Sequence, residues 1–125
     1  MIISKKTKHN LKLLKEPCIR VQRCGHIVLN ASAVKLLEIE DTNKDGVIFG
    51  YENNEIYVGY SDDVDCYKGA FKKMENSFRF GSKYEADNIL SSFNIKEKNA
   101  CFIISTEVQD IVIFEGYKLY KLKCQ

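Results

Sequence analysis

The chain has 125 residues, of which 45% are hydrophobic and 29% charged, and its net charge is +2. This length is enough to bury a core in one domain, and the composition excludes a disordered tail, a collagen and a disulfide-rich miniprotein. No apolar stretch is long enough to cross a membrane, and the amino terminus lacks the apolar core of a secretory signal. We therefore expect a cytoplasmic protein with reduced cysteines and no membrane contact.

Charge is distributed unevenly along the sequence. Residues 1–23 hold seven basic side chains and one acidic one, residues 24–66 hold two basic and nine acidic ones, and residues 67–125 hold ten basic and seven acidic ones. The amino-terminal segment 1–17 is thus a basic arm, which either is solvated or follows a polyanion such as DNA. Because 16 of the 19 basic residues are lysine, extensive reading of bases by arginine is disfavoured.

The first predicted elements are a hairpin and a short helix. Apolar and polar residues alternate over 18–21 and 26–29, on either side of Gly25, which predicts two paired strands. Asn30 is a favourable N-cap for the helix that follows. The apolar positions of this helix have helical spacing and comprise Ala33, Leu36 and Leu37.

A polar turn at 41–46 leads from the helix to a second predicted hairpin. The two β-rich runs VIFGY (47–51) and EIYVGY (55–60) flank Asn53-Asn54, a dipeptide that is typical of a tight turn between antiparallel strands. The first half of the chain therefore spans 18–61.

After a predicted linker at 62–76, a similar order of elements follows. Phe78 and Phe80 alternate with polar residues in a strand, and Ser82 with Glu85 forms a capping box. The next residues predict an amphipathic helix through the apolar positions Ala86, Ile89, Leu90 and Phe93.

Three strands are predicted after the second helix. The apolar runs 100–105 and 110–114 lack alternation, so we expect two strands around a polar turn that are buried on both faces, with Cys101 as a small core residue. The last run, 117–123, is rich in lysine, which is typical of a protected edge strand.

One pattern thus occurs twice: strand, short helix, polar turn and hairpin, with LLEI (36–39) matching SFNI (92–95). Residues 19–60 resemble the AbrB/SpoVT family of swapped-hairpin DNA-binding domains, through the hairpin glycine, the strand HIVL, the helix that ends in LLEI, the charged turn and the closing hairpin. A degenerate second copy would span 76–122.

The resemblance implies an α+β, mainly β fold in which two tandem strand-helix-hairpin halves form a small swapped-hairpin-like barrel. The halves would be 18–61 and 77–125, and 18–125 would be one structural domain. Two such halves either close the barrel within one chain or exchange hairpins between two chains in a homodimer.

The resemblance also implies contacts with double-stranded DNA. The residues at matching places are Arg20, Arg23, His26 and Lys35. The sequence departs from the family at Asn30, where a proline is usual, and in the helix, where Ala33, Val34 and Lys35 replace the usual arginines. The second copy offers only Arg79 and Lys83, so we expect contacts with phosphates more than with bases.

A different motif overlaps the first half. Residues 41–52 match the calcium loop of an EF-hand, with candidate metal ligands at Asp41, Asn43, Asp45 and Glu52. The strand predicted at 47–51 conflicts with this alternative, because an extended chain carries Glu52 well over ~15 Å from Asp45. A polar turn is therefore the preferred interpretation and calcium binding the alternative.

No catalytic motif is present, so we expect no enzyme, no cofactor and no small-molecule substrate. The first hypothesis is a small transcriptional regulator that binds DNA mainly through phosphates. The alternative is a protein-interaction or assembly module of phage or mobile-element type on the same fold. The bias towards lysine, asparagine and isoleucine is typical of an AT-rich genome.

Overall fold

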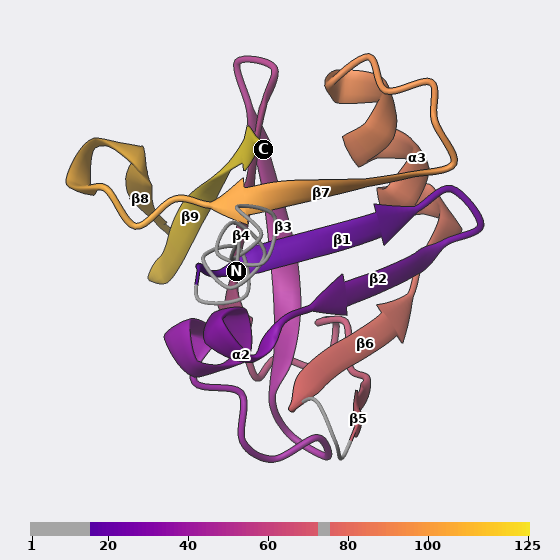
Figure 1. Cartoon of the computed structure of the whole chain (residues 1–125). Helices are drawn as coiled ribbons and strands as arrows, with labels where there is room; N and C mark the ends of the chain where they lie inside the picture. Colours follow the sequence, from indigo (N-terminus) through magenta and orange to yellow (C-terminus); the bar gives the residue numbers. More distant parts are fainter. Residues whose placement is uncertain (1–15, 73–75) are drawn as a thin grey trace, which may run out of the picture.

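The computed structural model describes residues 16–72 and 76–125. Within these residues the fold is mainly β: antiparallel strands form one strongly curled sheet, and two α-helices accompany it (Figure 1). The predicted mainly β class with two helices is therefore confirmed. The predicted basic arm, 1–17, lies outside the described residues except for Glu16 and Pro17.

The elements follow one another with short connections. In chain order they are β1 (Cys18–Gln22), β2 (His26–Leu29), α2 (Ala31–Leu37), β3 (Gly46–Glu52), β4 (Glu55–Ser61), β5 (Ala70–Lys72), β6 (Ser77–Gly81), α3 (Lys83–Ser92), β7 (Asn99–Ile104), a 3₁₀ turn (Val108–Asp110), β8 (Ile111–Phe114) and β9 (Tyr117–Cys124). The order of strands in the sheet is β3-β4-β9-β7-β1-β2-β6-β5, and β8 pairs with β9 outside this path.

The first helix begins where the sequence predicts it. The Oδ1 atom of Asn30 accepts hydrogen bonds from the backbone N–H of Ala33 at 2.9 Å and from that of Cys18 at 3.0 Å. One side chain therefore caps α2 and also fixes the start of β1. Its Nδ2 atom donates to the carbonyl oxygen of Glu16 at 2.7 Å, so both ends of the asparagine amide are used at this position.

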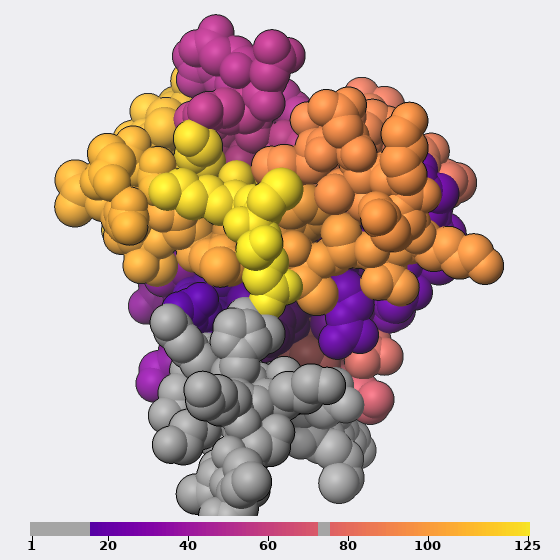
Figure 2. Space-filling view, turned by 45° about the horizontal axis from the view of Figure 1, so that its top comes forward, coloured from indigo at the N-terminus to yellow at the C-terminus, as the bar shows by residue number. Residues whose placement is uncertain are grey.

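The hairpin predicted around Asn53-Asn54 is confirmed. β3 and β4 pair from Gly46–Ser61 to Glu52–Glu55, and the two asparagines adopt φ values of 51° and 65°. Positive φ at both central residues is typical of a type I′ turn, which matches the twist of the strands. The tip of this hairpin projects from the surface in Figure 2.

The core lies on the concave face of the sheet. Alternate residues of β1, β2, β6 and β7 point into it, and both helices add apolar side chains from one face. The fully buried members include Ile19, Ile27, Phe78, Ile89 and Phe102. Burial of such a side chain stabilises the fold by about 1.5–3 kcal/mol, so alternation in the strands accounts for much of the fold.

The two edges of the sheet, at β3 and near β5, approach each other and are joined by an isolated β-bridge. The N–H of Val47 in β3 donates to the carbonyl of Tyr67 at 3.0 Å, and the N–H of Tyr67 donates to the carbonyl of Val47 at 2.8 Å. A Cβ atom on the neighbouring Gly46 would lie 2.4 Å from Cys66 Sγ and 2.6 Å from the carbonyl oxygen of Tyr67. Glycine at this position therefore permits the close approach that curls the sheet.

The carboxy-terminal strands differ from the prediction. β7 pairs with β1 and β9, whereas β8 pairs only with β9 among the described strands. The expectation that both runs are buried on both faces, with Cys101 in the core, is wrong. β7 buries Phe102 and Ile104 and exposes Cys101, and β8 exposes Ile113 and Phe114. A strand that is buried on one face needs apolar residues only at alternate positions. These two runs also have apolar residues at the positions between, which suggested burial on both faces.

Two further predictions are corrected. The lysine-rich strand β9 is an interior strand, because it pairs with β4, β7 and β8. Its Lys121 and Lys123 form ion pairs with Glu55 and Asp110, at 2.8 and 2.7 Å. Within the segment expected to be a linker, Ala70–Lys72 form the short strand β5, which pairs with β6.

Neither helix in the described residues combines the length and the apolar character needed to cross a membrane.

Candidate functional site

A hollow with a volume of about 530 Å³ lies beside the turn between β1 and β2. We call it the cationic hollow. Three separate parts of the chain form it: the turn, the start of α3 and the segment that joins α3 to β7. Its lining side chains are basic or neutral and comprise Gln22, Arg23, Cys24, Lys83, Lys98 and Asn99. In Figure 2 indigo atoms of the first hairpin lie beside orange atoms of the part of the chain that contains α3 and β7.

Arg23 holds one wall of the cationic hollow in place. Its Nη2 atom donates to the carbonyl oxygens of Ile95 at 2.7 Å and Glu97 at 3.2 Å, and its Nε atom donates to that of Glu97 at 3.3 Å. The backbone N–H of Arg23 also donates to the carbonyl of Lys98 at 2.7 Å. These bonds fix Lys98 beside the turn, so Arg23 is primarily a positioning residue.

The start of α3 forms the opposite wall. Lys83 Nζ donates to the carbonyl of Arg23 at 2.8 Å and to Asp87 Oδ1 at 2.9 Å, and the N–H of Ser82 donates to the carbonyl of Gly25 at 2.8 Å. Gly25 has φ of 108°, and a Cβ atom there would lie 3.0 Å from the backbone nitrogen of Lys83. The turn therefore packs directly on the helix N-terminus, which carries a partial positive charge.

The capping box predicted at the start of α3 forms only in part. Ser82 Oγ accepts the N–H of Glu85 at 3.1 Å, but Glu85 does not return the bond to Ser82. Instead, Glu85 Oε1 accepts the hydroxyl of Tyr51 at 2.5 Å. Burial and this carboxylate together raise the pKa of Tyr51, so the bond ties α3 to the β3–β4 hairpin.

The four residues predicted to contact DNA do not converge on one point. Arg23 lines the hollow, and Arg20 is exposed on β1 on the same outward face as Gln22. His26 is half-buried at the start of β2, opposite Gly81. Lys35 is in the last turn of α2, at the end of the β1–β2 hairpin away from its turn (Figure 1).

Sequence reasoning missed Lys98 and gave Lys83 only a minor place. Lys98 lies in the run KEK (96–98), which has no periodicity and resembles an ordinary solvated loop. Only the hydrogen bonds between the turn and this segment bring it beside Arg23, and those bonds join residues more than seventy positions apart.

The loop that matches an EF-hand is stabilised by its own side chains. Asp45 Oδ2 accepts the N–H groups of Glu40 at 2.9 Å and Asp41 at 3.0 Å, and Asp45 Oδ1 accepts the hydroxyl of Tyr60 at 2.6 Å. Asp41 Oδ1 accepts the N–H of Asn43 at 2.9 Å. The acidic residues therefore close a turn, as the preferred interpretation of this segment predicts.

The alternative of calcium binding at this loop is not supported. Glu52 is the last residue of β3, and β4 begins at Glu55, where an EF-hand requires a helix. At about 3.3 Å per residue, β3 places Glu52 ~20 Å from Asp45, so the four candidate ligands Asp41, Asn43, Asp45 and Glu52 cannot surround one ion. Within residues 16–72 and 76–125, no three histidine, cysteine or carboxylate side chains are grouped to hold a metal ion.

No family model, curated protein or solved structure matches this chain.

Proposed function

We propose that this protein binds the phosphate backbone of double-stranded DNA and is not an enzyme. The observation that carries the proposal is the cationic hollow, where Arg23, Lys83 and Lys98 from three parts of the chain meet and no carboxylate is among the lining side chains. The neighbouring N-terminus of α3 adds its partial positive charge. Arg20, exposed two residues before Gln22, extends this surface along β1.

The chemistry of the hollow favours phosphates over bases. Arg23 uses its guanidinium on the carbonyls of Ile95 and Glu97, so its fork is not available for a bidentate contact with guanine. Lysine is a compact point charge that neutralises a phosphate without reading a sequence. The proposed binding is therefore dominated by electrostatics and sensitive to salt, as befits a regulator or an architectural protein.

Two tandem halves, 18–61 and 77–125, around a swapped-hairpin-like barrel are part of this proposal. When the segment from Tyr67 to β5 is counted with the second half, β5 corresponds to β1. The pairing of β1 with β7 then has a counterpart in the bridge between Tyr67 and Val47 of β3. The β3–β4 pair likewise corresponds to β7 and β9, with β8 as an insertion. Corresponding strands of the two halves pair at two places, β2 with β6 and β4 with β9. This arrangement supports closure within one chain.

The experiment is a salt series of binding to a fluorescent DNA duplex, followed by anisotropy. We expect weak binding at low salt and a steep loss as salt increases. The double variant Arg20→Gln/Lys98→Gln should flatten the slope of log affinity against log salt by about 0.9 for each phosphate that the protein no longer neutralises. These side chains are exposed, so the fold should be kept.

The matched control is Lys44→Gln/Lys118→Gln, which removes the same charge from two exposed lysines that line a different concavity. An equal loss in both double variants would mean that net charge alone attracts DNA. That result, or the absence of binding at low salt, would contradict the proposal.

A further inference from the structure

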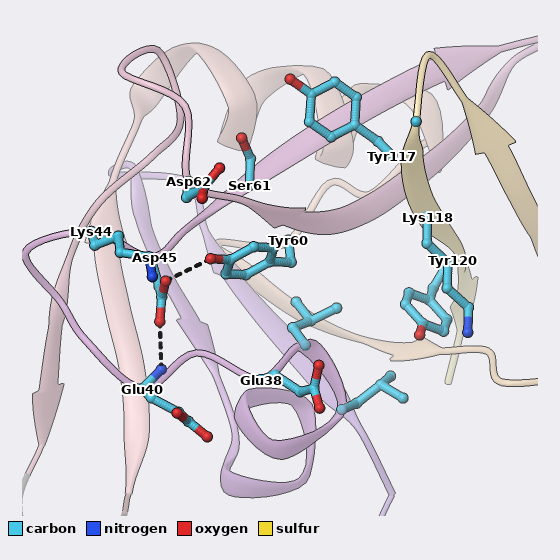
Figure 3. A pocket seen from close by; sticks show the side chains of 13 residues that line it. Glu38, Glu40, Lys44, Asp45, Tyr60, Ser61, Asp62, Tyr117, Lys118 and Tyr120 are labelled. Atoms are coloured by element: carbon cyan, nitrogen blue, oxygen red, sulfur yellow. Dashed lines mark hydrogen bonds between the residues drawn. The ribbon is translucent and has the colours of Figure 1, made fainter.

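A second concavity lies between the end of α2, the end of β4 and the β8–β9 turn, and has a volume of about 640 Å³. We call it the acidic groove. It is lined by four carboxylates, Glu38, Glu40, Asp45 and Asp62, against two lysines. Figure 3 places these carboxylates around Tyr60 on one side, with Tyr117, Lys118 and Tyr120 facing them. Its charge is thus opposite to that of the cationic hollow.

The floor of the acidic groove is held by hydrogen bonds and is negatively charged at physiological pH. Asp45 is only 6% exposed, and hydrogen bonds from the backbone around Asp41 and from Tyr60 lower its pKa to about 2. The same bond raises the pKa of Tyr60 to about 12. The negative charge of Asp45 and the position of the Tyr60 ring therefore persist across the physiological pH range.

Three tyrosine rings line the acidic groove, and one of them already lies beside a cation. Lys118 Nζ is 5.6 Å from the centroid of the Tyr120 ring. Tyr117 is held at the mouth by a hydrogen bond from its hydroxyl to Asp63. Aromatic faces among carboxylates attract ammonium and guanidinium groups by cation–π and ionic interactions together.

We propose that the acidic groove binds a lysine- or arginine-rich peptide segment of a partner protein. Charge complementarity identifies this occupant, because the excess of carboxylates attracts cations and disfavours phosphate groups and anionic lipid. The oxygens of Asp45 already accept hydrogen bonds within the chain, so this carboxylate contributes its charge and not a metal ligand. The groove is open and large enough for consecutive side chains, whereas a single metal ion would need converging ligands that the described residues do not provide.

The experiment measures binding of a fluorescent oligolysine peptide to the full chain by anisotropy, with oligoglutamate as the negative control. The variant Glu38→Gln/Glu40→Gln should weaken binding by about tenfold. The matched variant Glu52→Gln/Glu97→Gln removes the same charge from exposed positions outside the groove and should leave binding unchanged. Equal weakening in both variants, or no binding, would overturn the proposal.

Two variants of Tyr117 separate an aromatic site from a merely acidic surface. Tyr117→Phe keeps the ring and should bind oligolysine as the native chain does, whereas Tyr117→Leu should bind it several-fold less tightly. Equal binding by both would contradict the aromatic contribution. If replacing Lys5, Lys6 and Lys8 by glutamine instead raises the affinity for oligolysine, the chain's own amino-terminal segment is the occupant and the proposal of a partner fails.

The two proposals fail separately. The groove variants should leave the salt-dependent binding of DNA at the cationic hollow unchanged, because none of them lines the hollow. Loss of oligolysine binding with DNA binding intact would assign the interaction to the acidic groove alone.

Discussion

The cationic hollow and the acidic groove both lie where a helix end meets a turn, and each contains a residue with a left-handed backbone conformation. The residue type at that position differs between the two sites. At the hollow, the left-handed position is Gly25, with φ of 108°, packed on the N-terminus of α3. At the groove, it is Glu38, with φ of 56°, at the C-terminus of α2. Glycine adopts this conformation without strain, whereas a side chain makes it costly.

The residue at the left-handed position has a different role at each site. Gly25 serves packing, because it lets the first hairpin touch α3 and brings Arg23, Lys83 and Lys98 together. Glu38 keeps a carboxylate in the groove at a position that favours glycine or asparagine. Substitutions that exchange these features should therefore change stability in opposite directions at the two sites, while both weaken binding.

The largest effect is expected at the floor of the acidic groove. Asp45→Ala leaves the N–H groups of Glu40 and Asp41 and the hydroxyl of Tyr60 without their acceptor, which should lower the free energy of unfolding by up to about 3 kcal/mol. Urea denaturation measures this loss. The exposed Asp62→Ala on the rim should change the value by no more than about 0.5 kcal/mol, and a similar loss there would contradict the role of Asp45.

Acid titration follows the same carboxylate. The folded chain lowers the pKa of Asp45 to about 2 from its ordinary 3.8, so it contributes stability that is present above the ordinary value and lost as pH falls through the folded one. The melting temperature of the native chain should therefore decrease as the pH is lowered from about 4 to about 2. Asp45→Asn should show a smaller decrease over that interval, and an unchanged profile would show that Asp45 is not the group responsible.

A smaller loss is expected at the cationic hollow. Gly25→Ala places a Cβ atom 3.0 Å from the backbone nitrogen of Lys83 in a left-handed turn. The strain should cost about 1–2 kcal/mol in urea denaturation and weaken DNA binding, because the walls of the hollow separate. Gly81→Ala is the control: its Cβ atom meets nothing nearer than 3.9 Å, so its stability should match that of the native chain. Comparable losses in both variants would contradict the packing role of Gly25.

The smallest effect has the opposite sign. Glu38→Gly relieves the left-handed conformation at the end of α2 and should raise the free energy of unfolding by up to about 1 kcal/mol, measured in urea. Because it also removes a groove carboxylate, oligolysine binding should weaken although the protein is more stable. Glu38→Gln, which keeps the backbone strain, should weaken binding without the gain in stability. A destabilised Glu38→Gly would contradict this assignment.

Local signals in the sequence were sufficient for most of the elements. Alternation identified β1 and β2, Asn30 identified the start of α2, and Asn53-Asn54 identified the β3–β4 turn, because each signal acts over a few neighbouring residues. The carboxy-terminal part was harder. The apolar run at 111–114 suggests a buried strand, but β8 pairs with β9 and leaves Ile113 and Phe114 exposed. The local pattern does not predict this exposure.

The candidate sites depended on contacts that no local pattern encodes. Arg23 was identified from its place in the first hairpin, but Lys98 joins it only through hydrogen bonds across the chain. The acidic residues at 41–45 suggested a calcium loop, and only the position of Tyr60 on the neighbouring strand gave Asp45 its actual partner.

The sequence by itself determined the mainly β class, the two helices and their caps, and the excess of acidic residues in 24–66, because these follow from composition and from spacing along the chain. The tertiary structure decided which strands pair, that β9 is an interior strand, and that basic and acidic side chains gather in two separate concavities. Strand pairing brings distant residues together, and its outcome depends on how the whole sheet curls around the core.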